Sequence, residues 1–152
     1  MREIKFKAKT IGNEWVFGNV SHLKKDFSTA RKGHYISNSA GAPFAFMVRP
    51  ETICQFTGLQ DKNGVDIYEG DIIQVITYVN VQYEVFEPDK LVAQEIITVV
   101  SYNELFGAFE LVTIEEDLYL KSWGFYNEDE NNDLEIIGSI HTTPEIFNPS
   151  NK

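Results

Sequence analysis

Short segments that alternate between apolar and polar residues, separated by tight glycine corners, fill most of this chain from residue 52 to residue 141. Such period-two alternation is typical of a β-strand with one buried face. No long amphipathic segment separates the strands, so a parallel sheet with intervening helices is not expected. We expect strands over residues 52–57, 72–86, 94–102, 107–114 and 134–141.

The segment 72–86 is too long for one ordinary strand. At roughly 3.3 Å per residue it would extend about 50 Å, which exceeds the usual strand length. We therefore expect a bend or hairpin near Tyr78–Asn80, with Pro88-Asp89 ending the stretch. Together these elements favour a mainly β (β-rich α+β) fold, with a small, partly open SH3-like β-barrel over residues 50–152.

The first 49 residues predict a smaller, separate subdomain. Residues 3–8 alternate and residues 14–20 contain an apolar run, so each segment predicts a strand. Residues 34–48 are expected to be extended, with an interruption by small and turn-forming residues. We expect a strand-helix-strand arrangement over residues 1–49.

Residues 21–32 are the best candidate for a helix in this subdomain. Ser21 is a suitable N-cap, and Gly33 is suited to the C-terminal stop. The apolar stripe of this helix would consist of Leu23, Phe27 and Ala30. A second, short helical turn is expected from Thr143-Pro144-Glu145, because Pro is favoured at the first helical position.

The composition is that of a folded globular protein, since 43% of the 152 residues are hydrophobic and 24% are charged. A single cysteine, Cys54, excludes a disulfide framework and a four-cysteine zinc site. The longest apolar run is Ala42–Val48, against the roughly 18 residues that a membrane span needs. The charged N-terminus is unlike a signal peptide. We therefore expect a soluble, cytoplasmic protein with no membrane partner.

Charge is distributed unevenly along the chain. Residues 1–50 contain nine Lys or Arg and three Asp or Glu, a net charge of +6. Residues 51–152 contain four Lys or Arg and twenty Asp or Glu, a net charge of −16. An acidic surface repels phosphate, so nucleic acid is not expected to wrap most of the chain. The basic part allows a local patch, whose candidate residues are Lys5, Lys7, Lys9, Lys24, Lys25, Arg31 and Lys32.

No residue pattern points to an enzyme, a metal or a cofactor. Cys54 lies in a strand-like run without the helix N-terminus or cation that would activate a thiolate, so we expect a packed thiol. The three histidines are expected to be isolated from one another. Asp129, Asn131 and Asp133 begin a calcium-loop pattern, but its required Gly and Glu are missing. No phosphate-binding glycine loop and no nucleophile elbow occurs. We expect no catalytic residues, no metal ligands and no cofactor.

The most specific segment, residues 56–73, is a series of turns. Gly58 breaks a strand, and Asp61 is placed to hydrogen-bond the backbone of its own turn. Asn63-Gly64 reverses the chain, because both residues tolerate positive φ. A second tight corner, Glu69-Gly70-Asp71, leads into the next strand.

This segment resembles the YopX-like family of phage and prophage proteins. The resemblance rests on the pattern T-G-L-x-D-x-N-G-x-x-I-Y-E-G-D-I, here Thr57 to Ile72. It is supported by the opening Met1–Phe6 and by the ending Glu135–His141, with Pro144-Glu145 after it. The family is usually encoded in mobile elements, and the resemblance implies no established activity, no catalytic residue and no cofactor.

Two interpretations of the motif stay open: turn and corner residues, or contacts with a ligand or partner. Tyr68 is least explained by turns, because an exposed aromatic beside acids often marks recognition. The motif positions are Thr57, Gly58, Asp61, Asn63, Gly64, Tyr68, Glu69, Gly70 and Asp71.

We interpret the chain as a non-enzymatic accessory protein of a phage or prophage-like element, a β module that binds protein or assembles with itself. Its twenty aromatic residues and the opposite charges of its two parts suit interlocking surfaces. The expected partners are copies of the chain, or a protein of phage or host origin. Two alternatives are a nucleic-acid-binding module that uses the basic N-terminal third, and an acidic nucleic-acid mimic that acts on a host DNA-binding protein.

Overall fold

The computed structural model describes residues 3–38, 44–81, 90–113, 123–124 and 134–147. The chain forms two compact units. The first unit comprises Met1–Leu59 and Asp66–Glu69, and the second comprises Gln60–Val65 and Gly70–Lys152. The boundary expected near residue 50 lies inside the first unit.

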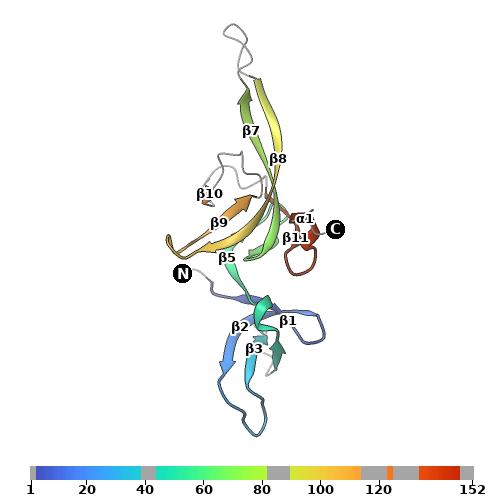
Figure 1. Ribbon diagram of the computed structural model, residues 1–152, viewed down its shortest axis with the longest axis vertical. Coiled ribbons are helices and arrows are strands. Elements are labelled where there is room, and N and C mark those ends of the chain that lie inside the picture. The colour runs from blue at the N-terminus through green and yellow to red at the C-terminus, as the bar shows by residue number, and fades with distance from the viewer. Residues whose placement is uncertain (1–2, 39–43, 82–89, 114–122, 125–133, 148–152) are drawn as a thin grey trace. The chain divides into compact units, whose positions relative to one another are not determined.

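A six-stranded sheet carries the first unit, in the strand order β4-β3-β2-β1-β5-β6 (Figure 1). β1 pairs antiparallel with both β2 and β5, and β3 pairs antiparallel with β2 and β4. A short 3-10 helix, η1 (Pro50–Thr52), precedes β5. The strands are β1 (Phe6–Lys9), β2 (Trp15–Leu23), β3 (Gly33–Asn38), β4 (Ala45–Val48), β5 (Cys54–Gln60) and β6 (Asp66–Tyr68).

The alternation in β1 sorts its side chains onto two faces of this sheet. Ala8 is fully buried with Ile36 and Val48, and these three form an apolar cluster. Lys7 and Lys9 alternate with Ala8, so they lie on the opposite face. The half-buried residues packed against the cluster are Phe6, Val16, Val20 and Ile53.

A five-stranded sheet carries the second unit, in the strand order β10-β9-β8-β7-β11. A single helical turn, α1 (Pro144–Phe147), follows β11, as predicted from Thr143-Pro144-Glu145. The pairings β7–β8, β8–β9, β9–β10 and β7–β11 are all antiparallel. The strands are β7 (Asp71–Val81), β8 (Lys90–Asn103), β9 (Ala108–Thr113), β10 (Trp123–Gly124) and β11 (Leu134–Ser139).

The second sheet is buried on both faces at its centre. Ile72 and Ile73 are adjacent in β7, and both side chains have no exposed surface. Val99 and Val100, adjacent in β8, are also buried. Because neighbouring residues of a strand point to opposite faces, both faces are covered at this level. This explains why the sequence loses its alternation at these two pairs.

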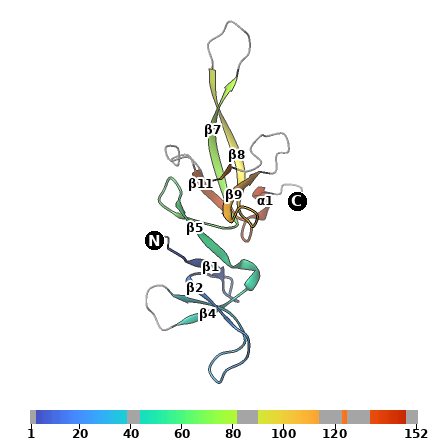
Figure 2. The ribbon, with the colours of Figure 1, turned by 90° about the vertical axis from the view of Figure 1, so that its left-hand side faces the viewer.

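Farther along, β7 and β8 continue as a two-stranded ribbon, which both views show extending past β9 and β11 (Figures 1 and 2). β11 pairs with β7 only as far as Val75, whereas the β7–β8 ladder runs on to the pair Val81↔Lys90. The bend or hairpin predicted near Tyr78–Asn80 is therefore wrong. In a two-stranded ribbon the inward-facing backbone groups of each strand bond the partner strand and the outward-facing groups can bond water, so the ladder can continue without a third strand. Pro88-Asp89 lies outside the described residues.

The helix predicted over residues 21–32 is also wrong. Residues Ser21–Leu23 belong to β2 and pair with Gly33–Tyr35 of β3, so only a nine-residue loop remains between the strands. The predicted apolar stripe does not form a buried face, since Phe27 is 54% exposed while Leu23 and Ala30 are half-buried. Tertiary strand pairing therefore overrides the local helix signal.

The mainly β class is confirmed by these two sheets. Both sheets are open in the described part of the chain, so the second unit is a sheet with a projecting ribbon and not a closed barrel. Among its described residues, the first unit contains strands and one 3-10 turn but no α-helix, which corrects the expected strand-helix-strand subdomain. Among the described residues, no helix has both the length and the apolar character needed to cross a membrane.

Candidate functional site

The motif Thr57–Ile72 carries the chain back and forth between the two units. Residues 57–59 belong to the first unit, 60–65 to the second, 66–69 to the first, and 70–72 to the second. The chain thus crosses three times within sixteen residues. We consider each of these four segments as a candidate site, and each is described by its contacts within its own unit.

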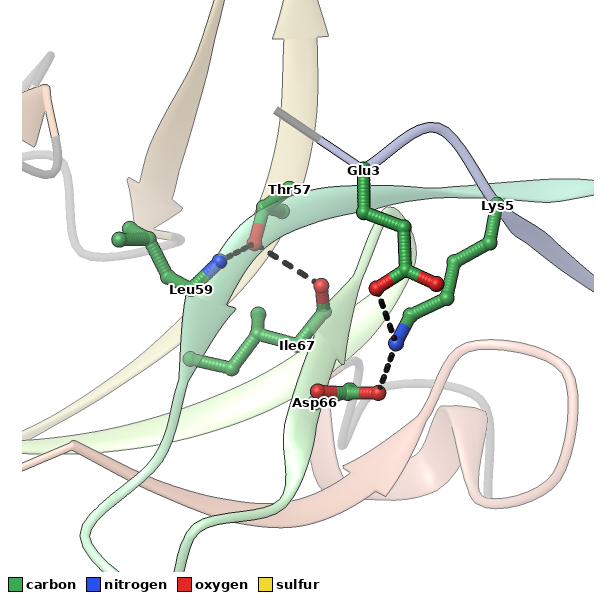
Figure 3. A network of polar contacts seen from close by, with 6 residues as sticks. All are labelled: Glu3, Lys5, Thr57, Leu59, Asp66 and Ile67. Carbon is green, nitrogen blue, oxygen red and sulfur yellow. Dashed lines mark hydrogen bonds and ion pairs between the residues drawn. The ribbon is translucent and has the colours of Figure 1, made fainter. Parts of the chain in front are cut away.

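Thr57 joins β5 to β6 through its side chain. Its hydroxyl donates to the carbonyl oxygen of Ile67 at 2.9 Å and accepts from the backbone N–H of Leu59 at 3.2 Å (Figure 3). Thr57 is buried; its bond to Ile67 is buried as well, and its bond with Leu59 is partly buried. A hydroxyl that donates once and accepts once here explains why a Thr suits this position. Gly58 follows with a φ of +94°, a conformation that favours glycine.

Asp61 organises the turn that follows. Its Oδ1 accepts from the backbone N–H groups of Asn63 at 2.8 Å and Val65 at 2.9 Å, and its Oδ2 accepts from Ile136 in β11 at 3.3 Å. Gly64 has a φ of +77°, which confirms the positive φ predicted for this turn. One carboxylate therefore closes the turn and ties it to a strand 75 residues away.

These contacts also set the charge state of Asp61, which is only 7% exposed. Burial works to raise its pKa, but the backbone hydrogen bonds from Val65, Ile136 and Asn63 outweigh it and hold the pKa below its usual value. Asp61 is therefore a structural carboxylate that stays ionised. Next to it, Lys62 forms an ion pair with Glu135 of β11, and its N–H donates to the carbonyl of Leu134.

Asp66 forms an ion pair with Lys5, and Lys5 also lies 3.3 Å from a carboxylate oxygen of Glu3 (Figure 3). The hydrogen bond with Asp66 raises the pKa of Lys5, burial opposes the rise, and Glu3 adds to it. An ion pair therefore joins the motif to the segment that precedes β1.

Tyr68 lies inside an aromatic cluster of the first unit. Its ring centroid is 5.5 Å from that of Phe56 and 6.0 Å from that of Phe17. The ammonium of Lys7 lies 4.8 Å from the Tyr68 centroid, and that of Lys5 lies 4.2 Å from the Phe56 centroid. Both distances are within cation–π range. Tyr68 is 3% exposed, so the exposed recognition aromatic expected there is not found.

Gly70 and Asp71 form the second corner. Gly70 has a φ of +77°, its N–H donates to Val100 at 2.8 Å, and its carbonyl accepts from Ile140 at 2.9 Å. Asp71 is 1% exposed and pairs in register with Ser139. The N–H of Glu69 donates to the carbonyl of Gln55 at 2.9 Å. Asp61, Gly64 and Gly70 therefore act in turns, whereas Thr57 and Gly58 lie inside β5, so Gly58 does not break that strand as predicted.

The basic residues singled out in the sequence fall into two groups. Lys5, Lys7 and Lys9 line one face at β1, where Lys7 and Lys9 lie 5.1 and 5.4 Å from the ring centroid of Trp15. Lys9 is only 6% exposed. The other four lie in the loop between β2 and β3: Lys24, Lys25, Arg31 and Lys32.

These two groups do not form one patch. The last residue of β2 that pairs with β1 is Gly18, opposite Phe6, and β2 continues five residues beyond it to Leu23. At roughly 3.3 Å per residue, about 17 Å of strand separates the β1 face from the loop. The single basic patch expected from the sequence is therefore two separate sites.

The remaining chemical candidates are structural or lie outside the described residues. Cys54 is 2% exposed and donates its thiol hydrogen to the carbonyl of Thr52, in agreement with the predicted packed thiol. His22 and His34 face each other across β2 and β3, with ring centroids 4.1 Å apart, which corrects the expectation that the histidines are isolated. The described residues contain no group of three metal-ligating side chains, and the acidic segment 129–133 is not among them.

One surface feature was missed at the sequence level: the turn between β8 and β9, residues Asn103–Gly107. The side chain of Asn103 accepts from the backbone N–H groups of Leu105 at 3.0 Å and Phe106 at 3.3 Å. Gly107 closes the turn with a φ of +62°. Leu105 is 92% exposed and Phe106 is 76% exposed. The signal was an apolar pair placed between Asn and Gly turn residues, where polar residues are usual.

These features define a mainly β protein of two compact units, linked through one glycine-rich motif. The family model described as YopX protein matches residues 4–148, so the chain belongs to the YopX family, as the motif indicated. No curated protein matches the chain. The crystal structure of protein EF1440 from Enterococcus faecalis is similar, with 24% sequence identity, coverage of 97% of this chain and 99% of that chain, and a TM-score of 0.49.

Proposed function

We propose that this chain is a non-enzymatic, protein-binding module of a phage or prophage-like element, and that it acts by self-association in the cytoplasm. The observation that carries the proposal is the Asn103–Gly107 turn, which leaves the side chains of Leu105 and Phe106 exposed to solvent. The backbone of this turn is already ordered by its hydrogen bonds, so docking of the two large apolar side chains does not have to order the turn, which favours binding.

The distribution of charge between the units supports the same function. The first unit contains nine Lys or Arg and six Asp or Glu, a net charge of +3. The second unit contains four Lys or Arg and seventeen Asp or Glu, a net charge of −13. Opposite charges on neighbouring copies steer association, while apolar contacts supply most of the affinity because exposed ion pairs contribute only about 0–1 kcal/mol each.

The test is the oligomeric state of the full chain, measured by light scattering at about 0.1 M and about 1 M salt. We expect an oligomer at low salt that weakens at high salt. The double variant Leu105→Ser/Phe106→Ser is expected to be monomeric at both salt concentrations.

The matched control is Ile4→Ser/Ile11→Ser, which removes two apolar side chains of 64% and 65% exposure from the first unit. This control should associate as the natural protein does. A natural protein that is monomeric at both salt concentrations would contradict self-association. A control variant that dissociates equally would show that the β8–β9 turn is not the contact.

A further inference from the structure

The loop between β2 and β3, residues Lys24–Lys32, is a strongly basic surface among the described residues of the first unit. It contains four cations and one carboxylate in nine residues, a net charge of +3. All four cationic side chains are exposed. We call this segment the basic loop; it closes the end of β2 and β3 that lies away from β1 (Figure 1).

The basic loop is ordered by its own hydrogen bonds. The N–H of Phe27 donates to the carbonyl of Ala30 at 2.7 Å, and the hydroxyl of Tyr35 donates to the carbonyl of Arg31 at 2.8 Å. Oδ1 of Asp26 accepts from the backbone N–H of Lys32 at 2.7 Å, so the one carboxylate of the loop is hydrogen-bonded to the loop's own backbone. The cations therefore start from an organised scaffold, which lowers the entropy cost of binding.

The cations of the basic loop differ from Lys5 and Lys7 at β1 in the groups that they contact within the protein. Lys5 is paired with Glu3 and Asp66, and Lys7 lies over aromatic rings. No described carboxylate forms an ion pair with any of the four loop cations. The charge of the loop is thus available to an external anion.

An aromatic ring accompanies these charges. Phe27 is 54% exposed, and the ammonium of Lys25 lies 5.6 Å from its ring centroid. We propose that the basic loop binds single-stranded nucleic acid, with the cations on its phosphates and Phe27 stacked on an unpaired base. Cations combined with stacking aromatics are the usual means of holding such strands.

Single-stranded nucleic acid fits this surface better than an acidic protein or a duplex. An acidic polypeptide supplies carboxylates but no base to stack on Phe27, and a duplex keeps its base faces stacked internally. The net charge of −10 is not spread evenly over the chain, because most acids belong to the second unit and the first unit by itself has a net charge of +3. This site is independent of self-association through the β8–β9 turn.

The experiment uses the full chain and a fluorescent oligothymidylate, with anisotropy measured between about 50 mM and 200 mM salt. Lys24→Ala/Lys25→Ala should weaken binding by about tenfold at low salt and reduce the salt dependence. Phe27→Ser should weaken binding by about tenfold and leave the salt dependence unchanged. The matched control, Arg49→Ala/Lys62→Ala, removes the same charge elsewhere and should change affinity less than about twofold. Circular dichroism of each variant confirms that it is folded.

Competition experiments identify the class of ligand. An unlabelled single strand should displace the probe far better than a duplex of the same length or polyglutamate. The proposal is overturned if the natural protein does not bind at the lowest salt, or if the folded Lys24→Ala/Lys25→Ala variant binds as tightly as the natural protein. It is equally overturned if polyglutamate or duplex competes as well as the single strand and Phe27→Ser has no effect.

Discussion

Two turns of the second unit are held by the same kind of hydrogen bond, but one turn is tied to a neighbouring strand and the other displays apolar side chains. In one, Asp61 accepts from the N–H groups of Asn63 and Val65; in the other, Asn103 accepts from those of Leu105 and Phe106. Each turn also contains a glycine with positive φ. The first turn is bonded to β11 through Ile136, whereas the second presents its apolar side chains to water.

The comparison shows that turn chemistry alone does not tell whether a turn is structural or displays a surface. The difference lies in the acceptor and in its surroundings. Asp61 is buried and uses both carboxylate oxygens, so its loss leaves three partly buried backbone N–H groups without their acceptor. Asn103 lies where water can replace its bonds. The two turns should therefore respond very differently to the same substitution.

Asp61→Ala should give the largest effect. Removing the carboxylate leaves three backbone N–H groups without their acceptor, and because these bonds are only partly buried, each loss costs about 1 kcal/mol, the low end of the range for an unsatisfied donor. We expect the free energy of unfolding, measured by urea denaturation, to fall by about 3 kcal/mol. A loss below about 0.5 kcal/mol, the scale of ordinary surface substitutions, would show that the turn is not held by Asp61.

The contribution of Asp61 should depend on pH. Its pKa is lower in the folded chain than in the unfolded chain, so its stabilisation is complete above the unfolded value of about 3.9 and is lost as the pH falls through the folded value. The stability difference between the natural protein and Asp61→Asn should therefore be constant near neutral pH and shrink below about pH 4. A difference that stays constant or grows in acid would contradict the lowered pKa.

Gly64→Val should have an intermediate effect. Gly64 has a φ of +77°, and a Cβ added there would have no neighbouring atom within 4 Å, so the cost comes from backbone strain and not from a clash. We expect a loss of about 1 kcal/mol or more in the free energy of unfolding. Gly64→Asn should recover most of it, because Asn tolerates this conformation. An unchanged melting temperature in Gly64→Val would count against the turn geometry.

Asn103→Ala should have the smallest effect on stability. It removes the two backbone bonds and a 3.0 Å hydrogen bond to Glu110, all near solvent, so we expect about 1 kcal/mol or less. Self-association should weaken as well, because Leu105 and Phe106 lose their scaffold. The control is Asn103→Asp/Glu110→Gln, which keeps the backbone acceptor and replaces the Glu110 carboxylate with an amide, so that no two carboxylates face each other. If it dissociates as Asn103→Ala does, the side-chain acceptor is not what organises the turn.

Much of the strand pattern could be predicted from the sequence, because each strand is a local run with its own period. The tight turn at Asn63-Gly64 and the helical turn after Thr143 were predicted for the same reason, since turn and cap residues act over a few positions. The predicted helix over residues 21–32 failed because pairing between β2 and β3 overrode a local signal. The bend near Tyr78–Asn80 failed because a long ribbon needs only its partner strand.

The features of the candidate sites also divide into those that could be predicted from the sequence and those that could not. The motif Thr57–Ile72, its turns and the family were identified from consecutive residues, because turn chemistry and family patterns are written in local order. Only the tertiary structure decided that Tyr68 is buried, that Asp61 reaches β11, and that the basic residues form two groups. Burial and register depend on which distant strands pair, and that pairing depends on the packing of the whole sheet and not on any single segment.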